Sequence, residues 1–403
     1  MSARPASNDC GIAVIGSGAA GLMAAIAAAD APDTVLFTDG PLGRSNSSMA
    51  QGGLQLPPPG AAALQRFGED MRRSAREALD PARIAAFVGH VQETIDCLVE
   101  WGLELDRDAG GEVVRRMAGG LSEPRIVSAR DQIGPAIMKV LLARVRAAAV
   151  HVADHARVVD VEPLERGVAL QVERAGGGCE RWRARAVVCC TGGITWREAQ
   201  RRARPTTNPA NDNHVLFDTL AARGLPLIHP DYYQFQPYGL AESGHEAVGR
   251  CVPESIVNFP VRLLDRDGAE IGAIGQDRYA LTQHMFACAE AGRAVRLDDG
   301  SPGFRLTLSD VAPEALRRHF PKLVQYLERH QRMGEDVLVF PFLHYYLGGF
   351  AVDARCATRV PGLFLAGEMV GGLHGRNRLM GNGITDSLVH GRLAGHTARE
   401  YVA

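Results

Sequence analysis

The sequence predicts an α/β fold built around a Rossmann-type nucleotide-binding sheet, and three stretches support this prediction. Residues 11–15 form an apolar run that leads directly into a glycine-rich turn, and an alanine-rich helix is expected over residues 22–29. A second apolar strand is expected over residues 34–37, and a third over residues 186–190. Apolar strands followed by glycine-rich turns and helices are typical of parallel nucleotide-binding sheets.

The glycine-rich turn has the GxGxxG spacing of a dinucleotide site. Gly16 allows a tight turn, Gly18 lets the backbone approach a pyrophosphate, and Gly21 lets the helix pack closely on the strand. A carboxylate soon after the second strand can accept the ribose hydroxyls. From this stretch alone the dinucleotide is either NAD or FAD, and the residues expected to contact it are Gly16, Gly18, Ala19, Ala20, Gly21 and Asp39.

Length and composition exclude several classes of protein. A chain of 403 residues exceeds a typical single domain, so we expect two domains. The formal net charge of -2 gives no electrostatic reason to expect nucleic acid as a partner. No run approaches the roughly 20 apolar residues of a membrane span, and the N-terminus lacks an apolar signal segment. We therefore expect a cytoplasmic protein without a membrane span.

The eight cysteines indicate reduced thiols. They are scattered without a CxxC motif, and the one adjacent pair, Cys189 and Cys190, lies in an expected strand. Neighbouring strand residues point to opposite faces, which prevents a disulfide between these two side chains. This pattern favours a reducing compartment, and no metal site is predicted.

Further helices and one hairpin are expected along the chain. Residues 158–162 and 168–173 alternate like the two strands of a hairpin. Apolar residues recur at helical spacing in other segments. These helices are expected over residues 62–79, 81–101, 131–142 and 314–332.

Two stretches resemble one family of flavoproteins. Residues 44–53 read RSNSSMAQGG and are similar to an SxxxAQGG loop. Residues 344–391 contain, in order, HYxxGG, PGLFLAGE, GGxHGxNRL and GNxxTD. With these motifs the chain resembles the fumarate reductase, succinate dehydrogenase and L-aspartate oxidase flavoproteins. The resemblance covers nearly the whole chain and is strongest over 11–53 and 341–395.

The resemblance implies non-covalent FAD as the cofactor. Succinate dehydrogenases carry a histidine in the loop that bonds covalently to the flavin, and Asn46 matches its position here. In the family, the strand that leads into the AGE sequence and the start of the helix that begins at the GN sequence also hold FAD. A further strand, followed by TGG, forms another contact with the dinucleotide. Together with the first turn, these matches place the following residues at FAD: Arg44, Ser45, Asn46, Ser47, Ala50, Gln51, Gly52, Gly53, Thr191, Gly192, Gly193, Glu368, Asn382, Gly383 and Ile384.

The family's fold implies two domains for this chain. We expect an α/β protein in which a Rossmann-type FAD-binding domain carries an inserted α+β capping domain that closes over the substrate. The FAD-binding domain would comprise residues 1–215 and 334–403, and the capping domain residues 216–333.

The resemblance also implies a substrate site. In the family, the histidine and the NRL arginine that match His344 and Arg378 grip a substrate carboxylate. Arg278 stands ten residues after the Asp267-Gly268 turn signal and matches the arginine that family mechanisms treat as a proton shuttle, the alternative being a surface arginine at a helix start. Two further matches to family substrate motifs are Gln236, in QFQPYG, and Glu254, in VPE.

Several positions depart from the family pattern. Gln236 replaces a histidine, and Tyr238 and Pro253 replace threonines, so two polar contacts of a dicarboxylate site are altered. Ala118 and Leu121 replace the acid and histidine of the aspartate oxidase loop. Segment 207–214 lacks the glycines of the family's TNPxxxTGDG motif. We therefore expect fumarate and succinate to be poor substrates.

The resulting expectation is an FAD-dependent oxidoreductase. It would transfer a hydride between flavin N5 and a small carboxylate-bearing substrate, by desaturation, oxidation or C=C reduction. The alternatives are an L-aspartate-oxidase-like amino-acid oxidase, a soluble fumarate reductase, and a non-catalytic flavin redox sensor whose substrate pocket has decayed. Because the sequence holds neither a haem-binding CxxCH motif nor a covalent FMN domain, electrons are expected to pass to or from oxygen, a quinone or a separate carrier.

Overall fold

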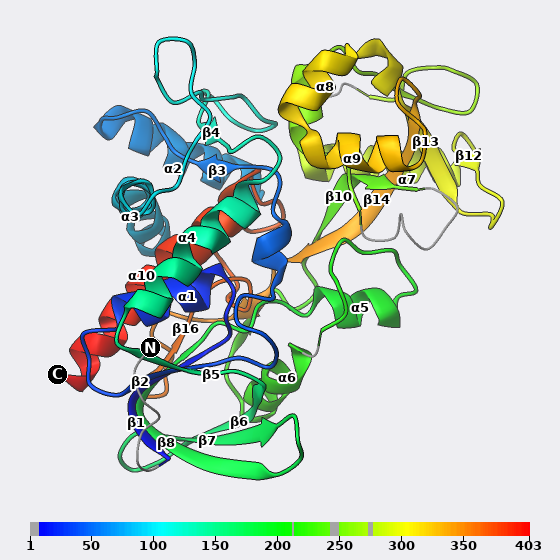
Figure 1. Ribbon diagram of the computed structural model, residues 1–403. Coiled ribbons are helices and arrows are strands. Elements are labelled where there is room, and N and C mark those ends of the chain that lie inside the picture. Colours follow the sequence, from blue (N-terminus) through cyan, green and yellow to red (C-terminus); the bar gives the residue numbers. More distant parts are fainter. Residues whose placement is uncertain (1–7, 212, 242–249, 273–276) are drawn as a thin grey trace.

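Figure 1 shows the computed structural model, which describes residues 8–211, 213–241, 250–272 and 277–403. Two of the sequence expectations fall partly outside these ranges. They are the lack of an apolar signal segment at the N-terminus and the interpretation of segment 207–214, which includes Asp212. A larger α/β part contains the first strands and the C-terminal helix, and a smaller part lies to one side of it. Among the described residues, none of the helices combines the length and the hydrophobicity that a membrane span requires.

The larger part is organised around a seven-stranded sheet with the order β5-β2-β1-β8-β7-β6, in which β16 also pairs with β8. Four strand pairs in this sheet are parallel, namely β5–β2, β2–β1, β1–β8 and β8–β16. The pairs β8–β7 and β7–β6 are antiparallel. The bounds are β1 Asp9–Ile15, β2 Thr34–Phe37, β5 Val150–Ala153, β6 Ala156–Pro163, β7 Val168–Arg174, β8 Cys179–Cys189 and β16 Leu363–Leu365. These strands confirm the predicted parallel core and hairpin.

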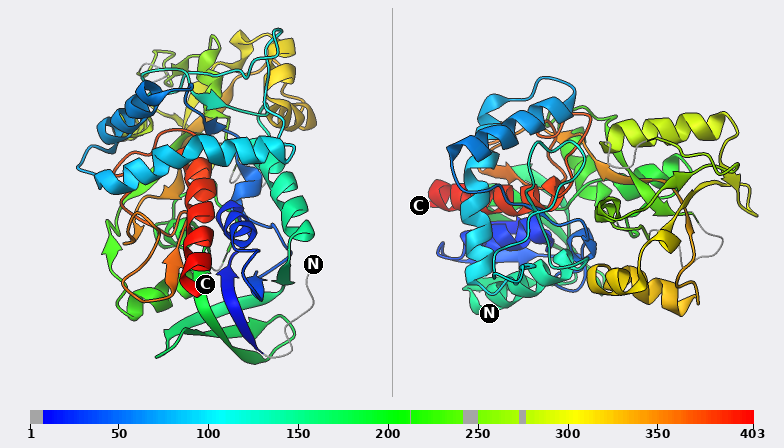
Figure 2. Two further views of the ribbon diagram at one scale, coloured as in Figure 1. Left: turned by 90° about the vertical axis from the view of Figure 1, so that its left-hand side faces the viewer. Right: turned by 90° about the horizontal axis from the view of Figure 1, so that it is seen from above.

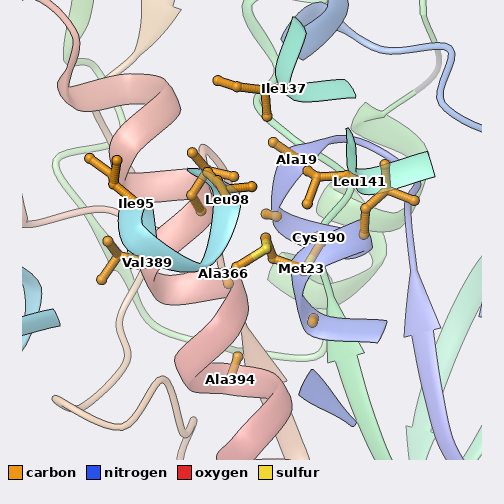
Figure 3. Packing of buried hydrophobic residues seen from close by; sticks show 14 of the residues in the cluster. Ala19, Met23, Ile95, Leu98, Ile137, Leu141, Cys190, Ala366, Val389 and Ala394 are labelled. Carbon is orange, nitrogen blue, oxygen red and sulfur yellow. The ribbon is translucent and has the colours of Figure 1, made fainter. Parts of the chain in front are cut away.

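One face of this sheet is covered by helices, of which α1 and α10 pack unusually closely. They are α1 Ala19–Ala27, α3 Pro81–Glu100, α4 Ile133–Ala147 and α10 Asn382–Val402. Figure 2 shows α3 crossing α10, and Figure 3 shows small side chains between α10 and α1. A Cβ added to Gly391 or Gly395 would lie 2.4 Å from a carbonyl oxygen of α1, so only glycine permits this approach.

The smaller part is built on a five-stranded sheet with the order β10-β14-β13-β11, and β12 pairs with β13. Its strands are β10 Tyr233–Leu240, β11 Leu263–Leu264, β12 Val295–Arg296, β13 Pro302–Leu306 and β14 Val337–Tyr346. Helix α7 Arg278–Glu290 and two short helices, α8 Pro313–His319 and α9 Pro321–Arg329, cover it. Their apolar side chains form a core separate from that of the larger part.

The single helix expected over residues 314–332 is wrong, because the chain forms α8 and α9 instead. Phe320 between them has φ -132 and ψ 53, outside the helical region. Proline has no backbone N–H and disfavours helical geometry in the residue before it, so Pro321 ends the first helix and starts the second. Helix α2 Ala61–Ala75 also ends earlier than expected, at the left-handed Arg76, and α4 extends beyond Leu142.

Two elements near the expected domain boundaries pack across them. Helix α6 His214–Ala222 contributes Leu216, Phe217 and Leu220 to a core shared with β1, β2 and β8. Strand β14 pairs with β10 and β13 in the five-stranded sheet. The remaining short elements are β3 Leu54–Gln55, β4 Ile126–Val127, β9 Leu227–Ile228, β15 Gly349–Phe350, α5 Thr195–Arg201 and three 3-10 turns at Asn46–Met49, Glu254–Asn258 and Leu308–Asp310.

Candidate active site

A cavity of about 710 Å³ lies where the two parts meet. It is lined by the loop before β3, by the end of β14, by the first residues of α7, α9 and α10, and by β10. The cavity brings together many of the residues that the sequence singled out. These are Asn46, Ser47, Ala50, Gln51, Gly52, Gly53, Gln236, Glu254, Arg278, His344, Glu368, Arg378, Gly383 and Ile384.

The turn after β1 lies at the carboxyl edge of the seven-stranded sheet. Gly16 has φ 104, and its N–H donates to the Phe37 carbonyl of β2 at 2.8 Å. A Cβ on Gly16 would lie 2.4 Å from the Cys190 carbonyl, and one on Gly21 would lie 1.7 Å from the Gly16 carbonyl. Both positions therefore require glycine, because strand, turn and helix touch through their backbones.

Asp39 and the loop of residues 44–53 are held in place by contacts with segments that are distant in the sequence. The Asp39 carboxylate is half exposed and forms an ion pair with Arg157 at 3.0 Å, a partner that the sequence did not indicate. In the loop, the Ser47 hydroxyl accepts the Ala19 N–H at 3.1 Å, which ties the loop to the first turn of α1. Gly134 of α4 permits close packing, because a Cβ there would lie 2.4 Å from the Ser47 carbonyl.

Arg378 is a buried cation facing the cavity. Its guanidinium lies over the Tyr345 ring at 4.3 Å, and its Nε has no hydrogen-bond partner among the described residues. Burial, followed by the nearby Arg278, lowers the pKa of Arg378 to about 10, so it is still charged at neutral pH. A Cβ on Gly383 would lie 2.8 Å from an Arg378 nitrogen, so Gly383 makes room for the guanidinium. A buried cation without a partner favours an anionic ligand.

His344 is a neutral imidazole beside this cation. Its Nδ1 is hydrogen-bonded to the Thr207 hydroxyl at 2.6 Å. Burial and the charges of Arg278 and Arg378 lower the pKa of His344 well below its ordinary value. Asn208 donates to the His344 carbonyl at 2.8 Å and accepts a hydrogen bond from Asn46. Asn208 thus connects Asn46, in the loop of residues 44–53, with His344, a link that the sequence did not reveal.

Comparison with known proteins identifies the family. A sequence model described as FAD binding domain matches residues 11–384. The chain belongs to this FAD binding domain family. It is 28% identical to an L-aspartate oxidase of Synechocystis sp., over 95% of this chain and 69% of that protein. It is also 28% identical to a fumarate reductase flavoprotein subunit of Mycobacterium tuberculosis, over 97% of this chain and 70% of that protein.

Solved structures agree with the sequence comparisons. The chain resembles E. coli quinol fumarate reductase FrdA with a TM-score of 0.87 and 25% identity, over 98% of this chain and 70% of that one. The predicted family and fold class are therefore confirmed. The protein is an FAD-dependent oxidoreductase of the fumarate reductase and aspartate oxidase family.

The residues of this flavoprotein fit FAD. The turn from Gly16 to Gly21 leads into the N-terminus of α1, where backbone N–H groups suit a pyrophosphate, and the Ser47 hydroxyl reaches the same helix end. Asn382 begins α10, and its Oδ1 is buried without a hydrogen-bond partner among the described residues. Thr191, Gly192 and Gly193 follow β8 at the same edge of the sheet. These groups lie where a dinucleotide can satisfy them.

Glu368 follows β16 and lines the cavity. Its carboxylate accepts the Tyr346 N–H at 2.9 Å and the Thr195 hydroxyl at 3.2 Å. Burial raises the pKa of Glu368 to about 7. A Cβ on Gly193 would lie 2.4 Å from this carboxylate, so glycine is required there. The sequence indicated Glu368 and Gly193 but not Thr195.

Arg278 lies in the cavity and not on the surface. It is the first residue of α7 and is buried, with its guanidinium bonded to Glu254 and to Gln234 Oε1 at 3.2 Å. Asp277, the other acid beside it in sequence, instead caps α7 by accepting the Ala280 N–H at 2.9 Å and pairs with Arg76 at 2.8 Å. Glu254 is therefore the acid that contacts Arg278.

The cavity also contains residues that the sequence did not single out. Cys251 faces Gln51 and Gln236, and burial raises the pKa of its thiol to about 11, which keeps it protonated. The Oε1 atom of Gln236 is buried without a hydrogen-bond partner in the described ranges. Four further lining residues, Arg250, Lys322, Gln325 and Tyr326, belong to the smaller part. No motif marked them, because their neighbours in the cavity are distant in sequence.

Proposed function

We propose that this flavoprotein oxidises or reduces a small acid at a carbon next to its carboxylate. The observation that carries the proposal is the buried, unpaired Arg378 guanidinium beside neutral His344. Both residues face the cavity that is also lined by the loop of residues 44–53. Non-covalently bound FAD would supply the hydride chemistry at N5. The protein's own residues then bind the acid, orient it and move a proton.

Arg378 and His344 would bind the carboxylate. The planar guanidinium offers two parallel N–H donors that match the two carboxylate oxygens. Because Arg378 has no competing carboxylate partner among the described residues, its charge is available to a ligand. Thr207 fixes the His344 ring through Nδ1, which leaves Nε2 as the nitrogen for the ligand.

Arg278 and Glu254 would transfer a proton to or from the substrate carbon. A guanidinium normally stays protonated, with a pKa above about 12, so Arg278 needs a partner to exchange protons. Glu254 is that partner, since its carboxylate is bonded directly to Arg278 Nε. In reduction, a proton leaving Arg278 for the substrate carbon would be replaced through Glu254, and in oxidation the proton would move in the opposite direction.

The substrate is proposed to differ from fumarate, succinate and aspartate. Gln236 and Pro253 line the cavity at the positions of family histidine and threonine residues, and neither offers an ionisable or hydroxyl donor. Leu121, at the position of the histidine in the aspartate oxidase loop, is buried and apolar. Oxygen, a quinone or a separate carrier would exchange the electrons. The eight free cysteines support the expected cytoplasmic location.

Stopped-flow absorbance of the bound flavin tests the proposal. The oxidised protein is mixed without oxygen with a panel of small acids and amino acids, and the reduced protein with unsaturated acids and keto acids. We expect at least one acid to bleach or reoxidise the flavin. If no acid changes the flavin spectrum, the protein is a flavin redox sensor and the proposal fails.

A further inference from the structure

Lys322 is an unusual residue in this chain. The sequence has 44 basic residues, of which only Lys139 and Lys322 are lysines. Lys139 is exposed on α4, whereas Lys322 is half-buried at the start of α9 and lines the cavity. The only lysine of the smaller part therefore lies in the wall of the active site.

A contact between the two parts holds this lysine in place. The buried Asp131 carboxylate, which precedes α4, accepts the backbone N–H groups of Lys322 at 2.8 Å and Leu323 at 3.4 Å. Asp131 thus caps α9 from across the boundary between the two parts. The backbone of Lys322 is fixed over the cavity, and its side chain is not required for that contact.

The Lys322 ammonium has no ion-pair partner among the described residues, although Asp131 and Cys251 lie near enough to raise its pKa. Desolvation is the larger effect and lowers the pKa of Lys322 overall. Of the acids that line the cavity, Glu254 is paired with Arg278, and Glu368 accepts hydrogen bonds from the Tyr346 N–H and the Thr195 hydroxyl. Arg378 on the larger part and Lys322 on the smaller part thus line the cavity without an ion-pair partner among the described residues.

We propose that Lys322 forms a second anion-binding subsite, so that the substrate carries an anionic group against α9 in addition to the carboxylate at Arg378. This inference rests on the proposed function. The subsite is separate from the altered positions Gln236 and Pro253, because it is built on a different element. The second group is a carboxylate, a phosphonate or a sulfonate, all of which an ammonium binds as a point charge.

Ligand binding to the FAD-loaded protein tests the subsite. Dissociation constants are measured from the flavin absorbance for glutarate, adipate, 3-phosphonopropionate and 3-sulfopropionate, each beside a monocarboxylate of equal chain length. Lys322→Met keeps the backbone contact to Asp131 and removes the charge. We expect it to weaken the best dianion about 10- to 100-fold, as for a hydrogen bond to a charged group, and to leave the monocarboxylates unchanged. Lys139→Met is the control and should change neither.

Trace acetylation provides a second readout that does not need a variant. Acetic anhydride labelling, followed by peptide mass analysis, gives the acetylation rates of Lys322 and Lys139 in one experiment. We expect the best dianion to slow labelling of Lys322 but not of Lys139, and a matched monocarboxylate to slow neither.

The outcomes separate this inference from the proposed function. Suppose that acids change the flavin spectrum, but that Lys322→Met weakens the binding of dianions and of monocarboxylates equally, or weakens the binding of neither. The subsite is then refuted and the proposed function stands. Failure of every dianion to protect Lys322 also refutes the subsite. If no acid binds or reacts at all, both proposals fail.

Discussion

Arg278 and Arg378 show how two buried arginines in one cavity can differ in role. Arg378 has a free face and stacks on Tyr345, whereas Arg278 is bonded to Glu254 and Gln234. A residue that binds the carboxylate acts in the ground state and the transition state alike. A residue that moves the proton acts in the transition state alone, so the two substitutions should have different kinetic effects.

We expect Arg378→Lys to raise KM about 10- to 100-fold with a small change in kcat, because an ammonium keeps the charge but loses the two parallel donors. We expect Arg278→Ala to lower kcat and kcat/KM together with little change in KM. Steady-state kinetics on the acid that bleaches the flavin fastest would measure both. Wild-type turnover in Arg278→Ala would assign the proton transfer to another residue.

Gln236 and Pro253 lead us to expect slow turnover of four-carbon dicarboxylates. Each polar contact to a charged group contributes roughly 1.5 to 3 kcal/mol, so losing two weakens a four-carbon dicarboxylate complex by orders of magnitude. Fumarate and succinate should therefore turn over slowly, and the double variant Gln236→His with Pro253→Thr should speed them. Fast fumarate turnover by the wild-type protein would contradict this expectation.

Glu368 should make stability depend on pH. Burial raises the pKa of its carboxyl from 4.5 to about 7 in the folded protein, so folding favours the protonated form. The folded state then holds more protons than the unfolded state between these values, and stability falls as the pH rises through them, by up to about 3 kcal/mol. Denaturant unfolding of the FAD-stripped protein at pH 5 to 8 should show this slope in the wild type. Glu368→Gln should flatten it.

At the scale of elements, the start of α9 couples the two parts. Proline at position 321 starts the helix, and Asp131 of the larger part caps it. We expect Asp131→Ala to cost about 1 kcal/mol of stability, the usual value of a lost cap, and also to raise KM because Lys322 loses its fixed position. Thermal unfolding and steady-state kinetics measure the two effects.

Asp80 is the matched control for this prediction. It caps α3 by accepting the Ala82 N–H at 2.8 Å, and α3 does not line the cavity among the described residues. Asp80→Ala should lower the melting temperature without changing KM. If both variants change KM alike, the effect on the cavity is a general one and does not come from α9.

At the scale of the whole molecule, the cofactor should join and stabilise both parts. Asn46 cannot form the histidyl linkage, so acid or heat should release all the flavin, and no fluorescent flavin should remain on the denatured band in a gel. A ligand that binds only the folded state at a hundred times its dissociation constant stabilises it by about 2.7 kcal/mol. Stripping FAD should therefore lower the melting temperature, as calorimetry would show.

Local sequence was sufficient for much of the fold and for the cofactor. Strands β1, β2 and β8 and the turn at Gly16 follow from apolar runs and from backbone contacts that only glycine permits. The same kind of reasoning failed over residues 314–332, where helical spacing of apolar residues outweighed the effect of Pro321 in the prediction.

The sequence by itself determined the FAD-binding family, the parallel sheet and the candidates Arg378 and His344, because each is encoded in a short run of neighbouring residues. Only the tertiary structure decided that Arg278 is buried against Glu254, that Asn208 connects Asn46 to His344, and that Asp131 holds Lys322 over the cavity. Asp131 and Lys322 are 191 residues apart. Contacts of this kind depend on how the two parts pack, and no local pattern of side chains specifies them.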